Sequence, residues 1–275
     1  MMSKIILVTG ASSGLGAATA QALAEAGHIA YAGMGAASGH PPIAGKLDGG
    51  AGHQGARPRP IALDVADQRS VSATVTDITA EAGRIDCVVH TMGPVPRGPV
   101  ESFTPYQLAQ IYDANVLSTQ RVNRAVLPQM RERQDGLLVW VVSRGDPADE
   151  APYLALHSES AAVIDHLAAS YAKELAGFGV EVTVVMAGLT VPETSRRLRL
   201  VLPDDLGTAQ AYEGRYPGLV DRVDAHLNDQ AATAARLART AHAVAAVVDS
   251  PKGARPPRVT AGAPGDRLRG TGDVG

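Results

Sequence analysis

Short hydrophobic runs alternate with longer amphipathic segments along the chain. The runs rich in Val, Ile and Leu predict buried strands, and the segments between them predict helices. Strands are expected at 4–9, 28–33, 60–64, 85–90, 137–142, 180–186 and 257–260, and helices at 14–26, 67–82, 104–132, 153–177 and 232–249. This alternation predicts one α/β domain, a single doubly wound parallel sheet with helices on both faces.

Local signals refine this pattern at three places. Thr104 followed by Pro105 is typical of a helix start. Residues 35–59 carry many glycines and prolines, so no stable crossover helix is expected there. The glycine-rich segment 262–275 is predicted to be a disordered tail, which leaves residues 1–261 as the folded domain.

A glycine-rich loop joins the first strand to the first helix. It reads Thr9-Gly10-Ala11-Ser12-Ser13-Gly14-Leu15-Gly16. Gly10 permits the tight turn, Gly14 lets the backbone approach a phosphate, and Gly16 lets the helix pack on the strand. The first N–H groups of the helix would then face a pyrophosphate. The strand–loop–helix context therefore predicts a dinucleotide-binding site.

The spacing Thr-Gly-x-x-x-Gly-x-Gly resembles the short-chain dehydrogenase/reductase family, and the resemblance extends to about residue 261. It implies a Rossmann-type fold, NADP or NAD as cofactor, and a substrate lid over about 190–230. It also places Asn115 and Ser143 at catalytic positions. The implied cofactor-binding residues are Gly10, Ser12, Ser13, Gly14, Leu15, Gly16, Asp64, Val65 and Gly93.

The chain differs from that family at the residues that transfer a proton to or from the substrate. In the family, a tyrosine exchanges a proton with the substrate, and a lysine one helical turn later binds ribose and lowers the pKa of the tyrosine. Here His157 stands at the tyrosine position and Ala161 at the lysine position. Gly35 provides no charged side chain for the adenosine half of the cofactor. Thr91 replaces a residue whose side-chain amide ties strands together in the family, so that amide is expected to be missing. Support for the dinucleotide is therefore weakened, while the phosphate loop is intact.

His157 is the leading candidate for catalysis, because an ordinary imidazole titrates near neutral pH without help from a lysine. Ser143 could hydrogen-bond it or bind a substrate oxygen. If a helix begins at Tyr153, that phenol and His157 share one helical face. The acids that could orient the imidazole are Asp146, Asp149, Glu150 and Glu159.

Three functional hypotheses follow from these residues. The favoured one is an enzyme whose acid–base chemistry at His157 cyclises, isomerises or dehydrates a small, hydrophobic, polyketide-like metabolite. It is favoured because the tyrosine, the lysine and several cofactor contacts are missing together. The second is an NAD(P)-dependent oxidoreductase with His157 or Tyr153 as proton donor. The third is a non-catalytic cofactor-binding or scaffold subunit.

Composition narrows the choice of partners. A net charge of −3 over 275 residues, with 45% hydrophobic residues, suggests neither a nucleic-acid nor a membrane partner. Cys87 is the sole cysteine, which fits a reducing cytoplasm, and the histidines lack the spacing of metal ligands. The family resemblance implies a homodimer or homotetramer that pairs through the helices at 104–132 and 153–177.

Overall fold

The sheet of the computed structural model has seven parallel strands in the order β3-β2-β1-β4-β6-β7-β9. The strands are β1 (Ile5–Val8), β2 (Ile29–Met34), β3 (Arg59–Ala62), β4 (Cys87–Thr91), β6 (Gly136–Ser143), β7 (Val180–Ala187) and β9 (Arg258–Thr260). The structure describes residues 2–12, 14–35, 57–91, 93–143, 152–188, 200–227 and 230–261. The predicted parallel α/β sheet is confirmed. Strand order reverses between β1 and β4, which opens a crevice at the carboxyl ends of these strands.

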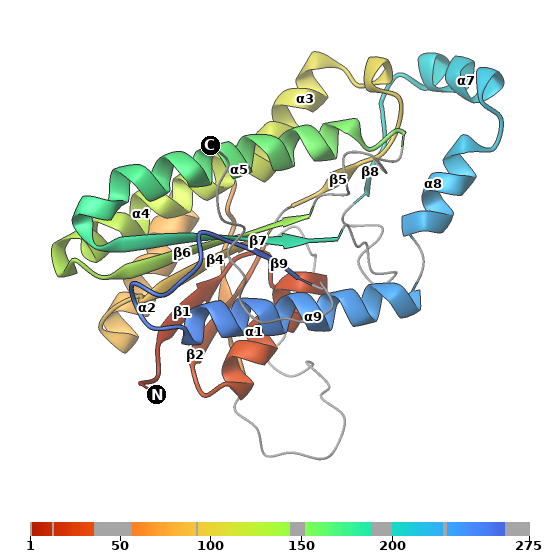
Figure 1. Cartoon of the computed structure of the whole chain (residues 1–275). Helices are drawn as coiled ribbons and strands as arrows, with labels where there is room; N and C mark the ends of the chain where they lie inside the picture. The colour runs from red at the N-terminus through yellow and green to blue at the C-terminus, as the bar shows by residue number, and fades with distance from the viewer. Residues whose placement is uncertain are drawn as a thin grey trace.

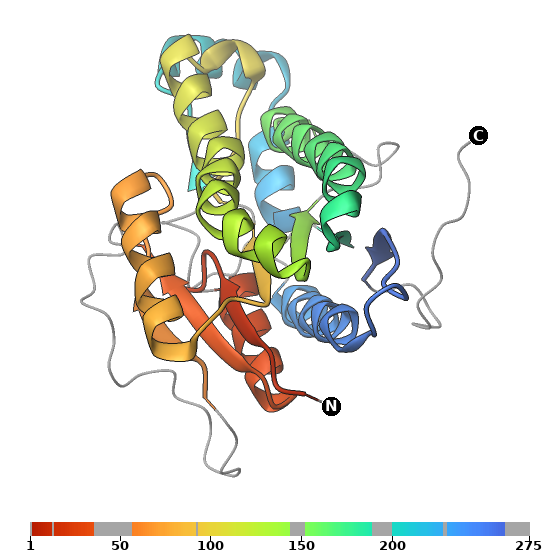
Figure 2. The same ribbon diagram turned by 90° about the vertical axis from the view of Figure 1, so that its left-hand side faces the viewer.

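Helices cover the sheet on both faces, as predicted (Figure 1, Figure 2). Helices α1 (Gly14–Glu25) and α9 (Gln230–Asp249) pack on one face. Helices α2 (Gln68–Ala82), α4 (Ser118–Arg133) and α5 (Ala155–Leu175) pack on the other. Every residue of β6 is buried, which explains why the central strands are continuous apolar runs rather than alternating ones.

The predicted helix 104–132 is interrupted. Its start is as expected: Thr104 and Gln107 form a reciprocal capping box ahead of α3 (Pro105–Tyr112). A π-helical turn, η3 (Asp113–Leu117), then separates α3 from α4. A π-helical turn contains about one residue more than an α-helical turn, which changes the directions of the side chains in this segment. Such turns are frequent at functional sites.

The predicted start of helix 153–177 is wrong by two residues. Tyr153 has a φ of +69°, a left-handed conformation that a helix cannot include, and α5 begins at Ala155. Tyr153 and His157 therefore do not share a helical face.

A small lid lies beyond the carboxyl ends of the strands (Figure 1). It contains the two-stranded pair β5 (Val95–Pro96) and β8 (Leu200–Val201), and helices α7 (Leu206–Arg215) and α8 (Leu219–Leu227). An apolar cluster holds it against the start of α5: Val95, Leu154, Val223 and Leu227. The described residues of the segment 190–230 thus lie over the end of the sheet, and the role of this segment as a substrate lid stays a prediction.

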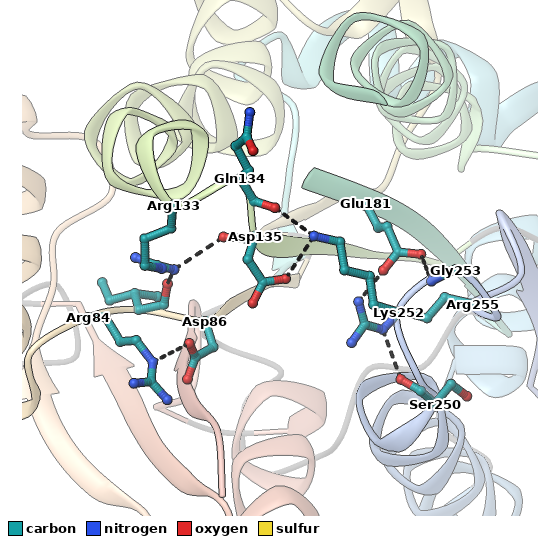
Figure 3. A network of polar contacts seen from close by, with 11 residues as sticks. Arg84, Asp86, Arg133, Gln134, Asp135, Glu181, Ser250, Lys252, Gly253 and Arg255 are labelled. Atoms are coloured by element: carbon teal, nitrogen blue, oxygen red, sulfur yellow. Dashed lines mark hydrogen bonds and ion pairs between the residues drawn. The ribbon is translucent and has the colours of Figure 1, made fainter. Parts of the chain in front are cut away.

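Ion pairs fasten the opposite, amino-terminal end of the strands (Figure 3). Lys252 pairs with Asp135 over 3.2 Å and donates to the carbonyl of Gln134. Glu181 pairs with Arg255 and accepts the backbone N–H of Gly253. The turn before β9 is thereby tied to the starts of β6 and β7.

Several sequence-based predictions lie outside the described residues. They concern the segment 36–56, the acids at 146–150, the lid residues 189–199, Ser13 and the tail 262–275. Among the described helices, none is both long and apolar enough to cross a membrane.

Candidate functional site

The predicted phosphate loop has the backbone geometry that its glycines permit. Gly10 and Gly14 have φ values of +63° and +59°, in the left-handed region that favours glycine. A Cβ on Gly16 would lie 2.3 Å from the carbonyl oxygen of Gly10, so only glycine allows α1 to approach the strand end this closely. Ser12 is exposed at the loop and Leu15 is buried beneath it.

The start of α1 suits an anion. The first turn carries no acidic residue, so the partial positive charge of the helix N-terminus is not neutralised. A phosphate at this point would meet backbone N–H groups rather than side chains.

Thr91 ties the loop to the neighbouring strand. Its hydroxyl donates to the carbonyl of Thr9 over 2.8 Å, and its backbone N–H donates to the Thr9 hydroxyl over 3.2 Å. Thr91 lacks the amide, as expected, but its hydroxyl supplies a bond between the two strand ends in its place.

Gly35 and Asp64 follow β2 and β3, at the end of the sheet where the resemblance implies the adenosine half of a cofactor. One carboxylate oxygen of Asp64 accepts the N–H of Ala66 over 2.9 Å, and the backbone N–H of Asp64 donates to Ser70. Val65 is half-buried beside Asp64, and Gly35 closes β2 without a side chain. One carboxylate oxygen of Asp64 therefore stabilises the turn that follows β3.

Asn115 is buried, and its side chain holds the backbone that follows β4. Its side-chain oxygen accepts the N–H of Gly93 over 2.9 Å, and its amide donates to the carbonyl of Pro94 over 3.1 Å. The π-helical turn places Asn115 at this point, 1% exposed. The side chain fixes the backbone that leaves β4 at the crevice.

His157 and Ser143 meet at the carboxyl end of β6. The Nε2 atom of His157 lies 2.8 Å from the backbone carbonyl of Ser143, and the histidine is 2% exposed. Because a carbonyl oxygen only accepts hydrogen bonds, Nε2 carries the hydrogen, and in the neutral ring Nδ1 bears the lone pair. A backbone carbonyl therefore orients this imidazole.

The lysine position itself carries no cation. Ala161 is fully buried in the core cluster between α5 and the sheet. Glu159 is exposed and lines a groove of about 300 Å³ between α3 and α5, so it does not orient the imidazole.

Tyr153 stands in front of α5 and beneath the lid. Its carbonyl accepts the N–H of Gly98 over 2.9 Å, which holds its left-handed backbone. Its hydroxyl is buried and forms no hydrogen bond within the described part of the chain. Burial raises the pKa of this phenol, and the nearby charge of Glu213 raises it further.

Glu213 was not identified from the sequence. It lies on α7, sixty positions after Tyr153, in a segment for which the sequence predicts only a lid. Nothing in its local pattern distinguishes it from a solvated helix residue. Only the folding of α7 toward Tyr153 brings this carboxylate to the site.

The crevice thus has a phosphate-binding loop at one end and an imidazole, a serine and a phenol at the other. Among the described residues, no group of three or more His, Cys, Asp or Glu side chains could hold a metal ion. The arrangement suits a bound dinucleotide phosphate and proton exchange with a small substrate.

Comparisons with known proteins agree with this geometry. A family model described as short chain dehydrogenase matches residues 4–200. The 3-ketodihydrosphingosine reductase of Bacteroides thetaiotaomicron is 31% identical over 188 residues, which are 68% of this chain and 64% of that protein. The chain thus spans slightly less than two thirds of that reductase.

Two further relatives show a similar match. The D-threitol dehydrogenase of Mycolicibacterium smegmatis is 31% identical over 196 residues, 70% of this chain and 73% of that enzyme. A solved short-chain dehydrogenase from Streptomyces avermitilis superposes with a TM-score of 0.70 at 26% identity, covering 94% of this chain and 88% of that one.

Proposed function

We propose that this chain, which belongs to the short-chain dehydrogenase family, is an NAD(P)-linked oxidoreductase acting on a small alcohol or carbonyl compound. The observation that carries the proposal is the phosphate loop, in which Gly16 lies against Gly10 and Thr91 holds Thr9. The reductase and dehydrogenase names of the relatives support this hypothesis over the non-redox chemistry centred on His157. A polyketide-like substrate stays a prediction.

The residues present fit the phosphate half of a dinucleotide. Gly10 and Gly14 leave room for the phosphates, and the first N–H groups of α1 would bind them. Asp64 follows β3 and Gly93 follows β4, so both lie at the carboxyl-terminal edge of the sheet. Gly35 offers neither a cation for a 2′-phosphate nor a carboxylate for a 2′-hydroxyl, so the proposal covers both NADP and NAD.

When bound, the nicotinamide would donate or accept the hydride. The protein's task is then to hold the substrate and to move one proton. We assign the proton to His157, whose Nε2–H is held by the Ser143 carbonyl and whose Nδ1 can accept a proton when an alcohol is oxidised. The Ser143 hydroxyl, at the end of β6, would contact the substrate oxygen.

Tyr153 is the weaker candidate for proton transfer. Its raised pKa means that its environment opposes the phenolate, whereas a proton-exchanging phenol needs that anion to be stabilised. A neutral phenol beneath the lid instead serves as a hydrogen-bonding group for the substrate.

Titration calorimetry with NADPH and NADH, followed by single-turnover oxidation of a panel of small alcohols, tests this proposal. Binding of at least one dinucleotide and formation of reduced nicotinamide are expected. Failure to bind either dinucleotide at millimolar concentration, or product formation that needs no dinucleotide, would overturn it.

We also propose that a second copy of the chain covers the groove between α3 and α5. The groove is lined by Leu108, Ile111, Tyr112, Leu156 and Val163, and Tyr112 is 43% exposed. The family resemblance implies pairing through these helices, and an exposed apolar strip supports it.

A further inference from the structure

Two polar atoms beneath the lid are buried without a hydrogen-bond partner among the described residues. They are the hydroxyl of Tyr153 and one carboxylate oxygen, Oε2, of Glu213. Buried polar atoms are nearly always paired, so each unpaired one calls for an explanation. Two of them on facing elements are costly to the folded chain unless something else contacts them.

The backbone fixes the positions of both side chains. Tyr153 is locked by its left-handed φ and by the N–H of Gly98, which donates to its carbonyl. Glu213 is anchored through its other oxygen, Oε1, which accepts the N–H of Gly218 over 2.6 Å. A non-glycine residue held at positive φ is strained, and such strain is concentrated at ligand-binding positions.

The two groups are neighbours but do not bond each other. The charge of Glu213 is close enough to raise the pKa of the Tyr153 phenol. The described surroundings include the apolar cluster of Leu154, Val223 and Leu227, and the nearby cation, Arg97, is paired with Asp224. The neutral phenol can donate and accept a hydrogen bond, while the carboxylate oxygen can only accept.

A ligand hydroxyl has the polarity that both atoms require. It would donate its hydrogen to Oε2 of Glu213 and accept the hydrogen of the Tyr153 phenol. A ligand carboxylate would be repelled by Glu213, and an apolar group would leave both protein atoms unpaired.

We propose that Tyr153 and Glu213 bind a second, non-reacting hydroxyl of the substrate, and that the substrate class is a diol or a hydroxyketone. This inference rests on the proposed oxidoreductase function, because it places the reacting hydroxyl at His157 and Ser143. The carbonyl of Leu154, next to Tyr153, accepts the backbone N–H of His157 over 3.0 Å, so both hydroxyls can be on one small substrate, and a vicinal diol is the simplest probe.

The test compares two ligands that differ by one hydroxyl, cyclohexanol and trans-cyclohexane-1,2-diol. Calorimetry gives the dissociation constant of each with the full chain, both with and without NADPH. We expect the diol to bind at least about tenfold more tightly, the value of one hydrogen bond to a charged group. In Tyr153→Phe and Glu213→Gln, the preference should fall to about twofold or less.

The matched controls are Tyr212, which directly precedes Glu213 on α7, and its exposed partner Glu101. The hydroxyl of Tyr212 donates to Oε2 of Glu101 over 2.8 Å, at an exposed position. Tyr212→Phe and Glu101→Gln therefore remove the same chemical groups outside the site and should keep the diol preference. Circular dichroism checks that Glu213→Gln, which retains an acceptor for Gly218, is folded.

The outcomes separate this inference from the proposed function. A preference for the diol without dinucleotide binding would support the inference and contradict the oxidoreductase proposal. Dinucleotide binding without a preference for the diol would support the oxidoreductase proposal and contradict the inference. Equal affinity for the two alcohols, no binding of the diol, or an unchanged preference in both site variants would overturn the inference.

Discussion

The side-chain hydroxyl of Thr91 donates a hydrogen bond to the backbone carbonyl of Thr9 over 2.8 Å. This bond joins the end of β4 to the residue that opens the phosphate loop. The Thr91 hydroxyl also lies where a Cβ on Gly10 would come within 2.6 Å of it, so the loop and the strand end fit together closely.

Removal of this bond is expected to weaken cofactor binding. Thr91→Val keeps the shape of the side chain but leaves the Thr9 carbonyl without its donor. The loss of one neutral hydrogen bond, about 1 kcal/mol, predicts a roughly fivefold rise in the dissociation constant for a dinucleotide. Calorimetry measures it, and Thr91→Ser, which retains the hydroxyl, is the control that should bind as the wild type does.

Gly16→Ala should disrupt the loop itself. The new Cβ would meet the Gly10 carbonyl at 2.3 Å, which forces α1 away from the strand. We expect a loss of stability of about 1–3 kcal/mol together with a loss of dinucleotide binding. Urea unfolding gives the free energy, and Gly177→Ala, where a Cβ meets nothing within 4 Å, is the matched control. An unchanged affinity in Gly16→Ala would show that the loop does not hold the cofactor.

His157→Ala should lower the turnover number while leaving dinucleotide affinity close to the wild-type value. Loss of a general acid–base group costs about 10²–10⁴ in rate. His166→Ala is the control, since His166 is exposed on the same helix. A rate loss of less than threefold would show that His157 does not transfer the proton and would favour Tyr153 as the proton donor.

His90 should make the stability of the fold depend on pH. Burial lowers its pKa from 6.5 to about 4, while its ring bonds Asn123 and stacks on Trp140. Between these two values the unfolded chain binds a proton that the folded chain does not. The free energy of unfolding should therefore fall as pH drops through this window, by about 3 kcal/mol in full, and this contribution should level off below pH 4.

Urea titrations at pH steps across that window measure the effect. His90→Phe keeps the stacked ring but removes the titrating group, so its stability should depend less on pH than that of the wild type. Equal slopes in the two proteins would contradict the assignment to His90.

A charge placed in the groove between α3 and α5 should break the proposed self-association. Tyr112→Glu puts a carboxylate on an apolar strip, which would cost several kcal/mol if the strip were buried by a second copy. Light scattering should show the wild type as a dimer or tetramer and the variant as a monomer. Tyr106→Glu, at a 70% exposed position outside the lining of the groove, is the control.

The sheet can be predicted from the sequence because the signals for its strands and helices are local and strong. The apolar run of β6 and the capping pair Thr104 and Gln107 each specify their element with neighbouring residues alone. The glycines of the phosphate loop were informative for the same reason, since each one has a steric role that the backbone shows.

The site itself depended on contacts that periodicity does not encode. Among the described residues, the carbonyl of Ser143, fourteen positions away, orients His157. The left-handed backbone of Tyr153 depends on Gly98, and Glu213 reaches the site only through the folding of the lid. Tertiary contacts of this kind override local propensity, and one sequence carries no signal for them.

The single tryptophan of the chain gives the crevice a built-in optical reporter. Trp140 lies three residues before Ser143 on β6, so the indole is about 10 Å along the strand from the end where a nicotinamide would bind. The emission of indole overlaps the absorption of reduced nicotinamide, and energy transfer over such a distance is efficient. Occupancy of the crevice should therefore be readable as a loss of tryptophan fluorescence, without any label and before the substrate is known.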